Sequence, residues 1–381
     1  MSRTIFVRYN YRVVIEREFI IDIGSSSIGA CFLERIPNEK PTLSYVKRVP
    51  IGTGSDATRA NIVEFTAQAL QSVTKGYEQL GRPQVVHVVL ASPWYTSRVR
   101  FVTSKAERPV RVSKSSVSKA VDAQSAQESA NSVISGTPVE SIVTQVYVNG
   151  YATRLHNTVN GTTLRLHVYE SAADKQFLDG IRDAVHKVFP SVTVKFHTFP
   201  LAAFLVLRDI RDEENFTFID AGGEVTDVAI VHRDSLRFIG SFPKGSNFFA
   251  RSLSQGSGVA DTMSRMSLYA RGELSADEEA NFRKAFDEAV KPWGEEYQKT
   301  IGTAQSDTAI PLTTFIAADM EELRWFGKAL ESVSGAFPAR PILMSPDFFQ
   351  AHVTLGESGV YDAFLSVEAL YVFTKNRDTI R

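Results

Sequence analysis

The sequence has 381 residues, which at about 150 residues per domain predicts two or three domains. Its 42 Lys and Arg residues balance 43 Asp and Glu residues, and the resulting net charge of −1 argues against nucleic acid as a partner. A hydrophobic fraction of 43% excludes a disordered chain, and the single cysteine, Cys31, excludes an internal disulfide framework.

The longest apolar run covers residues 201–207 and is too short to span a membrane. The first residues lack the apolar core of a signal peptide, and the last residues are too polar for an amphipathic membrane anchor. We therefore expect a cytoplasmic protein that reaches a membrane only through a partner.

Strand-like and helical patterns alternate along the first half of the chain, as is typical of layered α/β proteins. Apolar runs predict strands at 19–24 and 85–91. Between them, a helix ending at Gly81 is predicted from one apolar stripe made of Ile62, Phe65, Ala69, Val73, Tyr77 and Leu80. From about residue 98 the chain becomes Ser-rich and charged, which predicts a small α+β insert. Its expected elements are a helix at 113–129 and strands at 141–148 and 163–169.

A helix at 174–189 and a strand at 192–196 return the chain to the α/β pattern. A second α/β half then begins with three strands joined by tight turns, at 217–220, 225–231 and 236–242. Residues 259–308 predict a helical subdomain, in which Ser275 and Glu278 fit a capping box. The remaining expected elements are a strand at 311–318, a helix at 320–332, a strand at 341–344 and a helix at 361–373.

Two similar loops follow buried strands, one at residues 22–29 and one at residues 220–227. Each begins with an aspartate and contains glycines and hydroxyl side chains. Glycine lets the backbone approach a ligand closely, and successive backbone N–H groups form an anion-binding concavity. Either loop alone also fits an ordinary hairpin turn, but two of them, each on the first hairpin of an α/β half, predict a pair of phosphate-binding loops. Their paired carboxylates suit a hydrated Mg²⁺.

In these loops the sequence resembles the bacterial actin-like ATPases, in particular their PilM and FtsA branch. Residues 22–28 are similar to the phosphate-1 motif of PilM proteins, and residues 220–227 are similar to the phosphate-2 motif of FtsA. Residues 199–203 resemble the helix that connects the two halves, residues 245–248 the turn after phosphate 2, and residues 313–319 the adenosine motif. The resemblance covers nearly the whole chain in order and is strongest to the PilM proteins.

The resemblance implies that ATP or ADP binds with Mg²⁺ between the two halves. Asp22 and Asp220 would be the catalytic residues and would hold Mg²⁺ through water. The residues expected to bind the nucleotide are Asp22, Gly24, Ser25, Ser26, Ser27, Asp220, Gly222, Gly223, Thr226, Gly245, Ala317 and Ala318.

The fold implied by the resemblance is α/β, with two ribonuclease-H-like halves, an inserted α+β subdomain (SHS2, or 1C) and a helical 2B subdomain. The expected bounds are 1–97 and 173–204 for subdomain 1A, 98–172 for 1C, 205–258 and 309–381 for 2A, and 259–308 for 2B.

Two departures from the family pattern predict slow or absent hydrolysis. Phe199 stands where the superfamily often has a Gln or Glu that orients the attacking water, and a phenyl ring cannot polarise water. Ala317 and Ala318 stand where a Gly-Gly pair usually lets the backbone lie against the nucleoside. The chain is then at most a slow ATPase or a pseudo-ATPase.

The resemblance to PilM implies a cytosolic scaffold of type IV pilus or related secretion assembly. Such proteins bind a short cytoplasmic peptide from a bitopic inner-membrane protein, the PilN-like partner, beside the 1C subdomain. The alternatives are an FtsA-like cell-division protein, which would bind an FtsZ-like filament and self-associate, and a phosphotransferase of the same fold.

Three single residues have two interpretations each. His197 fits a hydrogen-bonded core histidine better than a cleft residue, and Cys31 fits a small core residue better than a nucleophile. Trp94 is expected to pack in the interior, with a peptide groove at residues 93–95 as the alternative.

Overall fold

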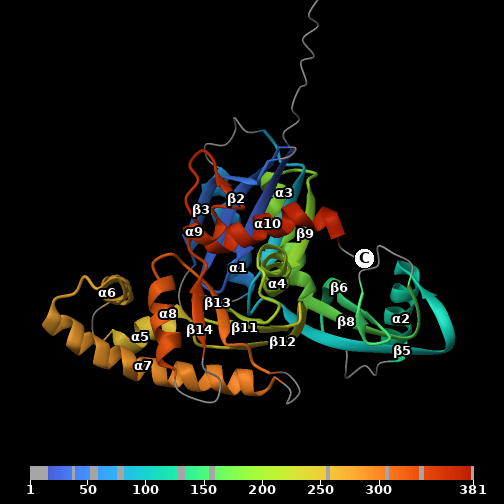
Figure 1. Cartoon of the computed structure of the whole chain (residues 1–381). Coiled ribbons are helices and arrows are strands. Elements are labelled where there is room, and N and C mark those ends of the chain that lie inside the picture. Colours follow the sequence, from blue (N-terminus) through green and yellow to red (C-terminus); the bar gives the residue numbers. More distant parts are fainter. Residues whose placement is uncertain are drawn as a thin grey trace, which may run out of the picture.

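The computed structural model describes residues 16–36, 39–51, 59–74, 81–127, 134–153, 159–254, 258–304, 309–333 and 339–378. These residues form three sheets with helices around and between them (Figure 1). Tyr77 and Leu80 of the first predicted helix lie outside the described residues. None of the described helices is long and apolar enough to cross a membrane.

The first half of the molecule is built on a six-stranded sheet with the order β15-β3-β2-β1-β4-β9. Strands β1, β2 and β3 form an antiparallel meander, and β4 and β9 add in parallel to β1. The bounds are β1 Glu16–Ile23, β2 Ser27–Arg35, β3 Thr42–Pro50, β4 Val85–Leu90, β9 Thr193–Thr198 and β15 Thr354–Leu355. The last of these lies in the segment 309–381 and was not predicted, because two exposed residues carry no apolar pattern.

The two faces of this sheet are covered by different helices. Side chains alternate between the faces of a strand, so Phe19, Ile21 and Ile23 of β1 pack on one side, against α1 (Arg59–Thr74) and α3 (Lys175–Val188). Ile20 points to the other side, toward the centre of the molecule. This packing explains the apolar stripe predicted on the first of the two helices.

The insert forms a separate four-stranded sheet with the order β5-β8-β6-β7 and one helix, α2 (Lys114–Gln127). Its strands are β5 Thr96–Val112, β6 Thr137–Val148, β7 Tyr151–Ala152 and β8 Val159–Ala173. Figure 1 shows this sheet at one side of the molecule. Strand β5 was not predicted, because residues 103–111 are mostly exposed and charged and lack a regular apolar alternation.

The second half contains a five-stranded sheet with the order β12-β11-β10-β13-β14. The three predicted consecutive strands form its antiparallel part, and β13 and β14 add in parallel. The bounds are β10 Phe216–Ala221, β11 Thr226–His232, β12 Ser235–Phe242, β13 Thr313–Ala318 and β14 Arg340–Leu343.

Helices cover the outer face of this second sheet with a core rich in aromatic rings. The predicted capping box at Ser275 and Glu278 is confirmed, and the helix that it begins runs on through Pro292. The helices are α5 Ser246–Leu253, α6 Val259–Arg271, α7 Ala276–Gly302 and α8 Leu323–Ser332, with a short α9 at Pro346–Phe349.

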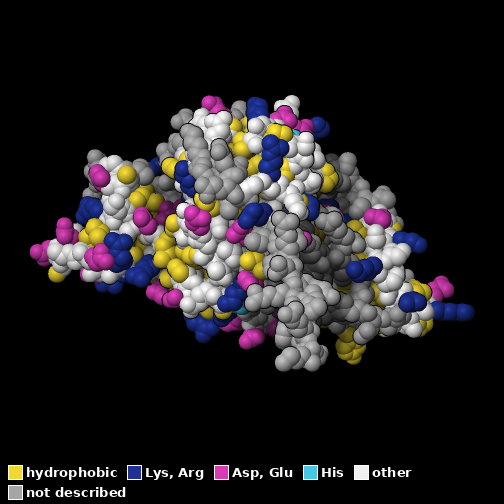
Figure 2. Space-filling model, turned by 90° about the horizontal axis from the view of Figure 1, so that it is seen from above, with side chains coloured by type: hydrophobic (Ala, Val, Ile, Leu, Met, Phe, Trp, Pro, Cys, Tyr) yellow, Lys and Arg dark blue, Asp and Glu magenta, His cyan; other side chains and the backbone are white. Residues whose placement is uncertain are grey.

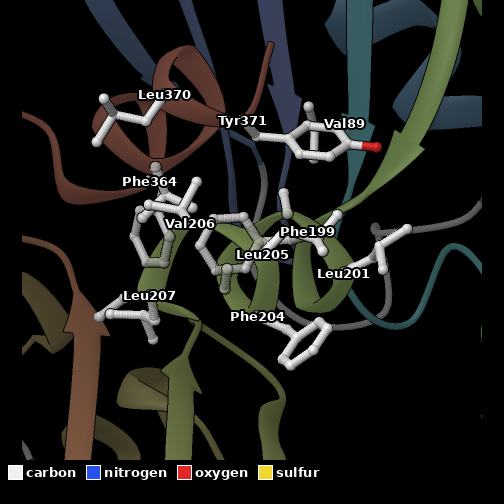
Figure 3. Close-up of a cluster of buried hydrophobic side chains, with 14 of the residues drawn as sticks. Val89, Phe199, Leu201, Phe204, Leu205, Val206, Leu207, Phe364, Leu370 and Tyr371 are labelled. Carbon is white, nitrogen blue, oxygen red and sulfur yellow. The ribbon is translucent and has the colours of Figure 1, made fainter. Parts of the chain in front are cut away.

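Helices α4 (Phe199–Ile210) and α10 (Ala363–Asp378) form a middle layer between the two large sheets (Figure 1). Their side chains face one another in a continuous apolar cluster, as Figure 3 shows for Phe199 and Phe364. Phe199 is fully buried and also lies against Phe218 of β10. Strands β1 and β10 therefore pack on opposite sides of this core, through Ile20 and Phe218.

A buried polar network fastens the insert to this middle layer. Glu140 of β6 accepts hydrogen bonds from the backbone N–H and the hydroxyl of Thr198, at 3.0 and 2.7 Å, and from the hydroxyl of Tyr371 at 2.8 Å. His197 lies 3.1 Å from the same carboxylate and 3.0 Å from a ring nitrogen of His87. The expectation of a hydrogen-bonded core histidine at 197 is confirmed.

Candidate functional site between two hairpin loops

The alternation of side chains along the strands places three aspartates toward the middle layer. Asp22 shares a face of β1 with Ile20, and Asp220 shares a face of β10 with Phe218, and both of these apolar residues belong to the central core. Asp227 faces Asp220 across the antiparallel pair of β10 and β11. The three carboxylates therefore approach the junction of the two halves from both sheets.

The two predicted phosphate loops touch one another at this junction. The hydroxyl of Ser25 accepts a hydrogen bond from the backbone N–H of Glu224 at 3.0 Å. Gly223 lies so close to Ser26 that an added Cβ would be 2.2 Å from the Ser26 Cβ. Glycine is needed at 223 because any side chain there would push the loops apart.

The start of helix α5 supports the second loop from behind. The backbone N–H groups of Ser246 and Asn247 donate to the carbonyl oxygens of Gly222 and Gly223, at 3.0 and 2.8 Å. A Cβ at Gly245 would lie only 2.1 Å from the Gly222 oxygen, so this close backbone approach needs glycine. Gly245 thus shapes the second loop and does not line the cavity.

A cavity of about 30 Å³ lies between the loops, which is room for about one water molecule. Eight of the twelve predicted nucleotide-binding residues line it: Asp22, Gly24, Ser25, Ser26, Ser27, Asp220, Gly222 and Gly223. The structure brings these residues together from two segments about 200 positions apart in the sequence.

The remaining predicted residues lie near the cavity without lining it. Thr226 is buried, and its hydroxyl donates to the carbonyl oxygen of Lys244 at 2.8 Å. Ala317 and Ala318 belong to strand β13, where one faces the central core and the other the helical core. Asp319, the next residue, reaches the cavity.

Arg48 of strand β3 is the main positive charge at the cavity wall. Its guanidinium donates to Asp22 at 2.8 Å and to both oxygens of Asp362 at 2.8 and 3.1 Å, and lies 3.5 Å from Asp319. A further donor reaches the hydroxyl of Ser27 at 2.9 Å. Burial alone would lower the pKa of Arg48, but these carboxylates raise it well above its usual value, so the charge is permanent.

Asp220 and Asp227 have no such contact with a cation among the described residues. Burial, together with the charge of Asp227, raises the pKa of Asp220 well above its usual value. Burial also raises the pKa of Asp227 to about 6, and it raises that of Asp22 to about 6 in spite of Arg48. One oxygen of Asp227 is buried without a hydrogen-bond partner among the described residues. An unpartnered oxygen beside a second carboxylate fits a hydrated divalent cation, since hard cations prefer oxygen ligands and Mg²⁺ keeps its waters.

Within the described ranges, no group of three or more acidic, histidine or cysteine side chains has the geometry to enclose a metal ion. A cation at Asp220 and Asp227 would therefore be held through water or through the oxygens of a bound ligand.

Several site residues were missed in the sequence. Arg48 lies on a strand that was not predicted, and Asp362 caps the last helix, so neither carries a local signal of a site. Glu368 of α10 is fully buried, and its pKa is raised well above its usual value by burial and by Asp22. Asp319 carries a local signal that could have been used. It directly follows strand β13, which is parallel to β10, and Asp220 and Asp22 likewise lie near the ends of their strands.

Two single-residue interpretations are settled by the packing around the first loop. Trp94 is buried, stacks on Phe177 and donates from its indole N–H to the carbonyl oxygen of Gly24 at 2.7 Å. It therefore packs in the interior and fixes the first loop. Cys31 is buried in the central core, as expected of a small core residue, and burial raises the pKa of its thiol well above its usual value.

Comparisons with known proteins give a fold. No protein-family model matches the sequence, and no curated protein matches it. The structure is similar to one described as "PilM-PilN type IV pilus biogenesis complex", with a TM-score of 0.61 and 14% identity over 93% of this chain and 98% of that one. MreB 5 of Spiroplasma citri bound to AMPPNP has a TM-score of 0.47 and 10% identity, over 95% of this chain and 96% of that one. EutJ from Carboxydothermus hydrogenoformans has a TM-score of 0.46 and 8% identity, over 94% and 90%.

At these identities the likeness shows the fold alone, and the first of the three structures carries it. The chain has the mixed α/β fold of the actin-like ATPases, and the fold class predicted from the sequence is confirmed.

The raised pKa of Asp220 predicts a stability cost at the site. A carboxyl whose folded-state pKa is raised destabilises the fold increasingly as pH rises above its unfolded-state pKa. Asp220→Asn removes the titration, so in metal-free buffer we expect it to raise the free energy of unfolding by about 1–2 kcal/mol at pH 8, and by much less at pH 4. Urea denaturation measures this, with the exposed Asp183→Asn as the control. A less stable Asp220→Asn protein at pH 8 would contradict it.

Proposed function

We propose that this chain binds ATP or ADP with Mg²⁺ between its two hairpin loops. The observation that carries the proposal is the direct contact of the two loops, each led by a buried aspartate, with Gly223 of the second loop against Ser26 of the first. Loops of this kind cradle phosphates with backbone N–H groups. The fold supports the same assignment, because it is the fold of the actin-like ATPases.

The carboxylates of the site would bind the waters of Mg²⁺, and the hydroxyls would bind the phosphates. The unpartnered oxygen of Asp227 and the carboxylate of Asp220 would accept hydrogen bonds from the waters of Mg²⁺. Asp22 would do the same from the opposite loop. Bound Mg²⁺ would neutralise the phosphates, and the hydroxyls of Ser25 and Ser26 lie where the phosphate oxygens would enter.

Nucleotide entry requires the loops to separate. The present cavity holds about one water molecule, so the Ser25–Glu224 hydrogen bond must break for a triphosphate to enter. Arg48 lines the same cavity and would add its positive charge to the phosphate site while it holds Asp22 and Asp362. Nucleotide would thereby act as a wedge between the halves.

Hydrolysis is expected to be slow. Phe199, at the position of the expected water-orienting residue, is fully buried between Phe218 and Phe364 and offers no polar atom. A positioned base typically contributes 10²–10⁴-fold to the rate, and none is supplied from this position.

We further propose a scaffold role like that of PilM, with a short cytoplasmic peptide from a bitopic inner-membrane protein docking at the 98–172 insert. Three of the large hydrophobic side chains that the described residues expose belong to this insert: Phe101, Val110 and Tyr151, which are 44%, 51% and 78% exposed. Phe101 and Val110 lie on β5 and Tyr151 on β7, the two edge strands of this sheet. Large apolar side chains exposed on one small subdomain are compatible with a partner surface.

The nucleotide proposal predicts micromolar binding of Mg·ATP and Mg·ADP in a calorimetric titration. Asp22→Ala and Asp220→Ala should each weaken this binding at least about tenfold, because each removes a ligand of the Mg²⁺ waters. The exposed Asp183→Ala should bind as the wild-type protein does. Turnover should stay below about one per minute for want of a positioned base. Unchanged binding in both site variants, or no binding at millimolar nucleotide, would contradict the proposal.

The partner proposal predicts that Phe101→Asp weakens binding of the cytoplasmic peptide of a co-encoded inner-membrane protein, measured by fluorescence anisotropy. We expect a loss of about tenfold or more, since a charge replaces an apolar contact. Val360→Asp is the matched control, because Val360 is also well exposed, at 66%, but lies outside the insert. Equal losses for the two variants would count against docking at the insert.

A further inference from the structure

Helix α7 carries charges of alternating sign at every fourth residue over most of its length. Helix α7 also forms the outer edge of the second half in Figure 1, away from the two hairpin loops. The six residues are Glu279, Arg283, Asp287, Lys291, Glu295 and Lys299, which we call the charge ladder.

All six ladder residues line one groove of about 1150 Å³, bounded by α7, α8 and the end of α6. Its floor is apolar, with Phe286 and Val290 of α7 beneath the charged rim. Side chains at i and i+4 form a ridge that is inclined to the helix axis, so a helix that crosses α7 meets the middle of the ladder, from Arg283 to Glu295. In Figure 2, acidic and basic side chains lie side by side at the end of the molecule where Figure 1 places α6 and α7.

The ladder residues are not locked into ion pairs with one another. Within the described part of α7, Lys291 pairs with Glu288 at 2.6 Å and Lys299 with Glu296 at 3.7 Å, both three residues away. Lys291 and Glu288 are each 63% exposed, so their pair is weak and can exchange for another partner.

The order of signs along the ladder is complementary to its own reverse. In an antiparallel copy of α7 that crosses at its middle, each of the four central ladder residues would meet a charge of the other sign. Arg283 would meet Glu295, and Asp287 would meet Lys291, about a two-fold axis between 287 and 291. Ridges of the i±4 type pack against one another in the most common class of helix contacts, and a two-fold axis makes both surfaces identical.

We propose that the charge ladder of α7 is a docking surface for α7 of a second copy of this chain, in an antiparallel and two-fold symmetric contact. A partner surface of one sign would meet a like charge at every second ladder position, whereas a second ladder meets none. The contact leaves the two hairpin loops and the 98–172 insert open, so it is compatible with a ligand at either place.

Charge reversal at two ladder positions tests the proposal on the full-length protein. We expect sedimentation equilibrium of the wild-type chain to show a monomer–dimer equilibrium that weakens with added salt. Arg283→Glu places Glu against Glu295 twice in a dimer, and Glu295→Arg places Arg against Arg283 twice. Each variant alone should therefore self-associate at least about tenfold more weakly than the wild type.

An equimolar mixture of these two variants should recover the dimer, because every facing pair in the mixed dimer again has opposite signs. Recovery on mixing separates this proposal from a role of the ladder within one helix, which mixing cannot restore. Lys284→Glu, an exposed reversal on α7 outside the ladder, should dimerise as the wild type does. A wild-type chain that stays monomeric at low salt, or variants that do not associate when mixed, would overturn the proposal.

Discussion

The ion pairs of Arg48 with Asp22, Asp319 and Asp362 hold the centre of this molecule together. Its guanidinium contacts carboxylates from both halves, because Asp22 ends a strand of the first sheet, Asp319 follows a strand of the second, and Asp362 begins the last helix. Without this cation the buried carboxylates would repel one another, and breaking a buried ion pair from one side typically costs about 3–5 kcal/mol. Arg48 therefore fixes the first loop, the last helix and the end of β13 in one arrangement.

On the opposite wall of the cavity, the buried carboxylates are not neutralised by an ion pair. Asp220 and Asp227 are buried beside one another, no cation among the described residues contacts either carboxylate, and burial raises the pKa of both. A fold that keeps such a pair accepts a loss of stability, which is characteristic of sites that bind a positive ligand. The loops close over this wall through glycine contacts and one hydrogen bond, so little interaction has to be broken to open them.

The two loops could be predicted from the sequence because their signal is local: an aspartate, glycines and hydroxyls directly after an apolar strand. The ordering of the strands into two α/β halves follows from the same apolar runs. Arg48 and Asp362 could not be predicted, since they meet Asp22 only through tertiary contacts across 26 and 340 positions of sequence. The position of a motif in the sequence did not predict the surroundings of Ala317 and Ala318. Strand β13 extends to 318, and its two methyl groups point into the central core and the helical core.

We propose that the loops at 22–29 and 220–227 form one nucleotide site. Amide hydrogen exchange, followed by mass spectrometry with and without saturating Mg·ATP, tests this proposal. We expect peptides covering both loops to exchange more slowly with nucleotide, and peptides covering α7 to exchange at the same rate. Slower exchange in one loop alone, or in neither loop while nucleotide is bound, would contradict it.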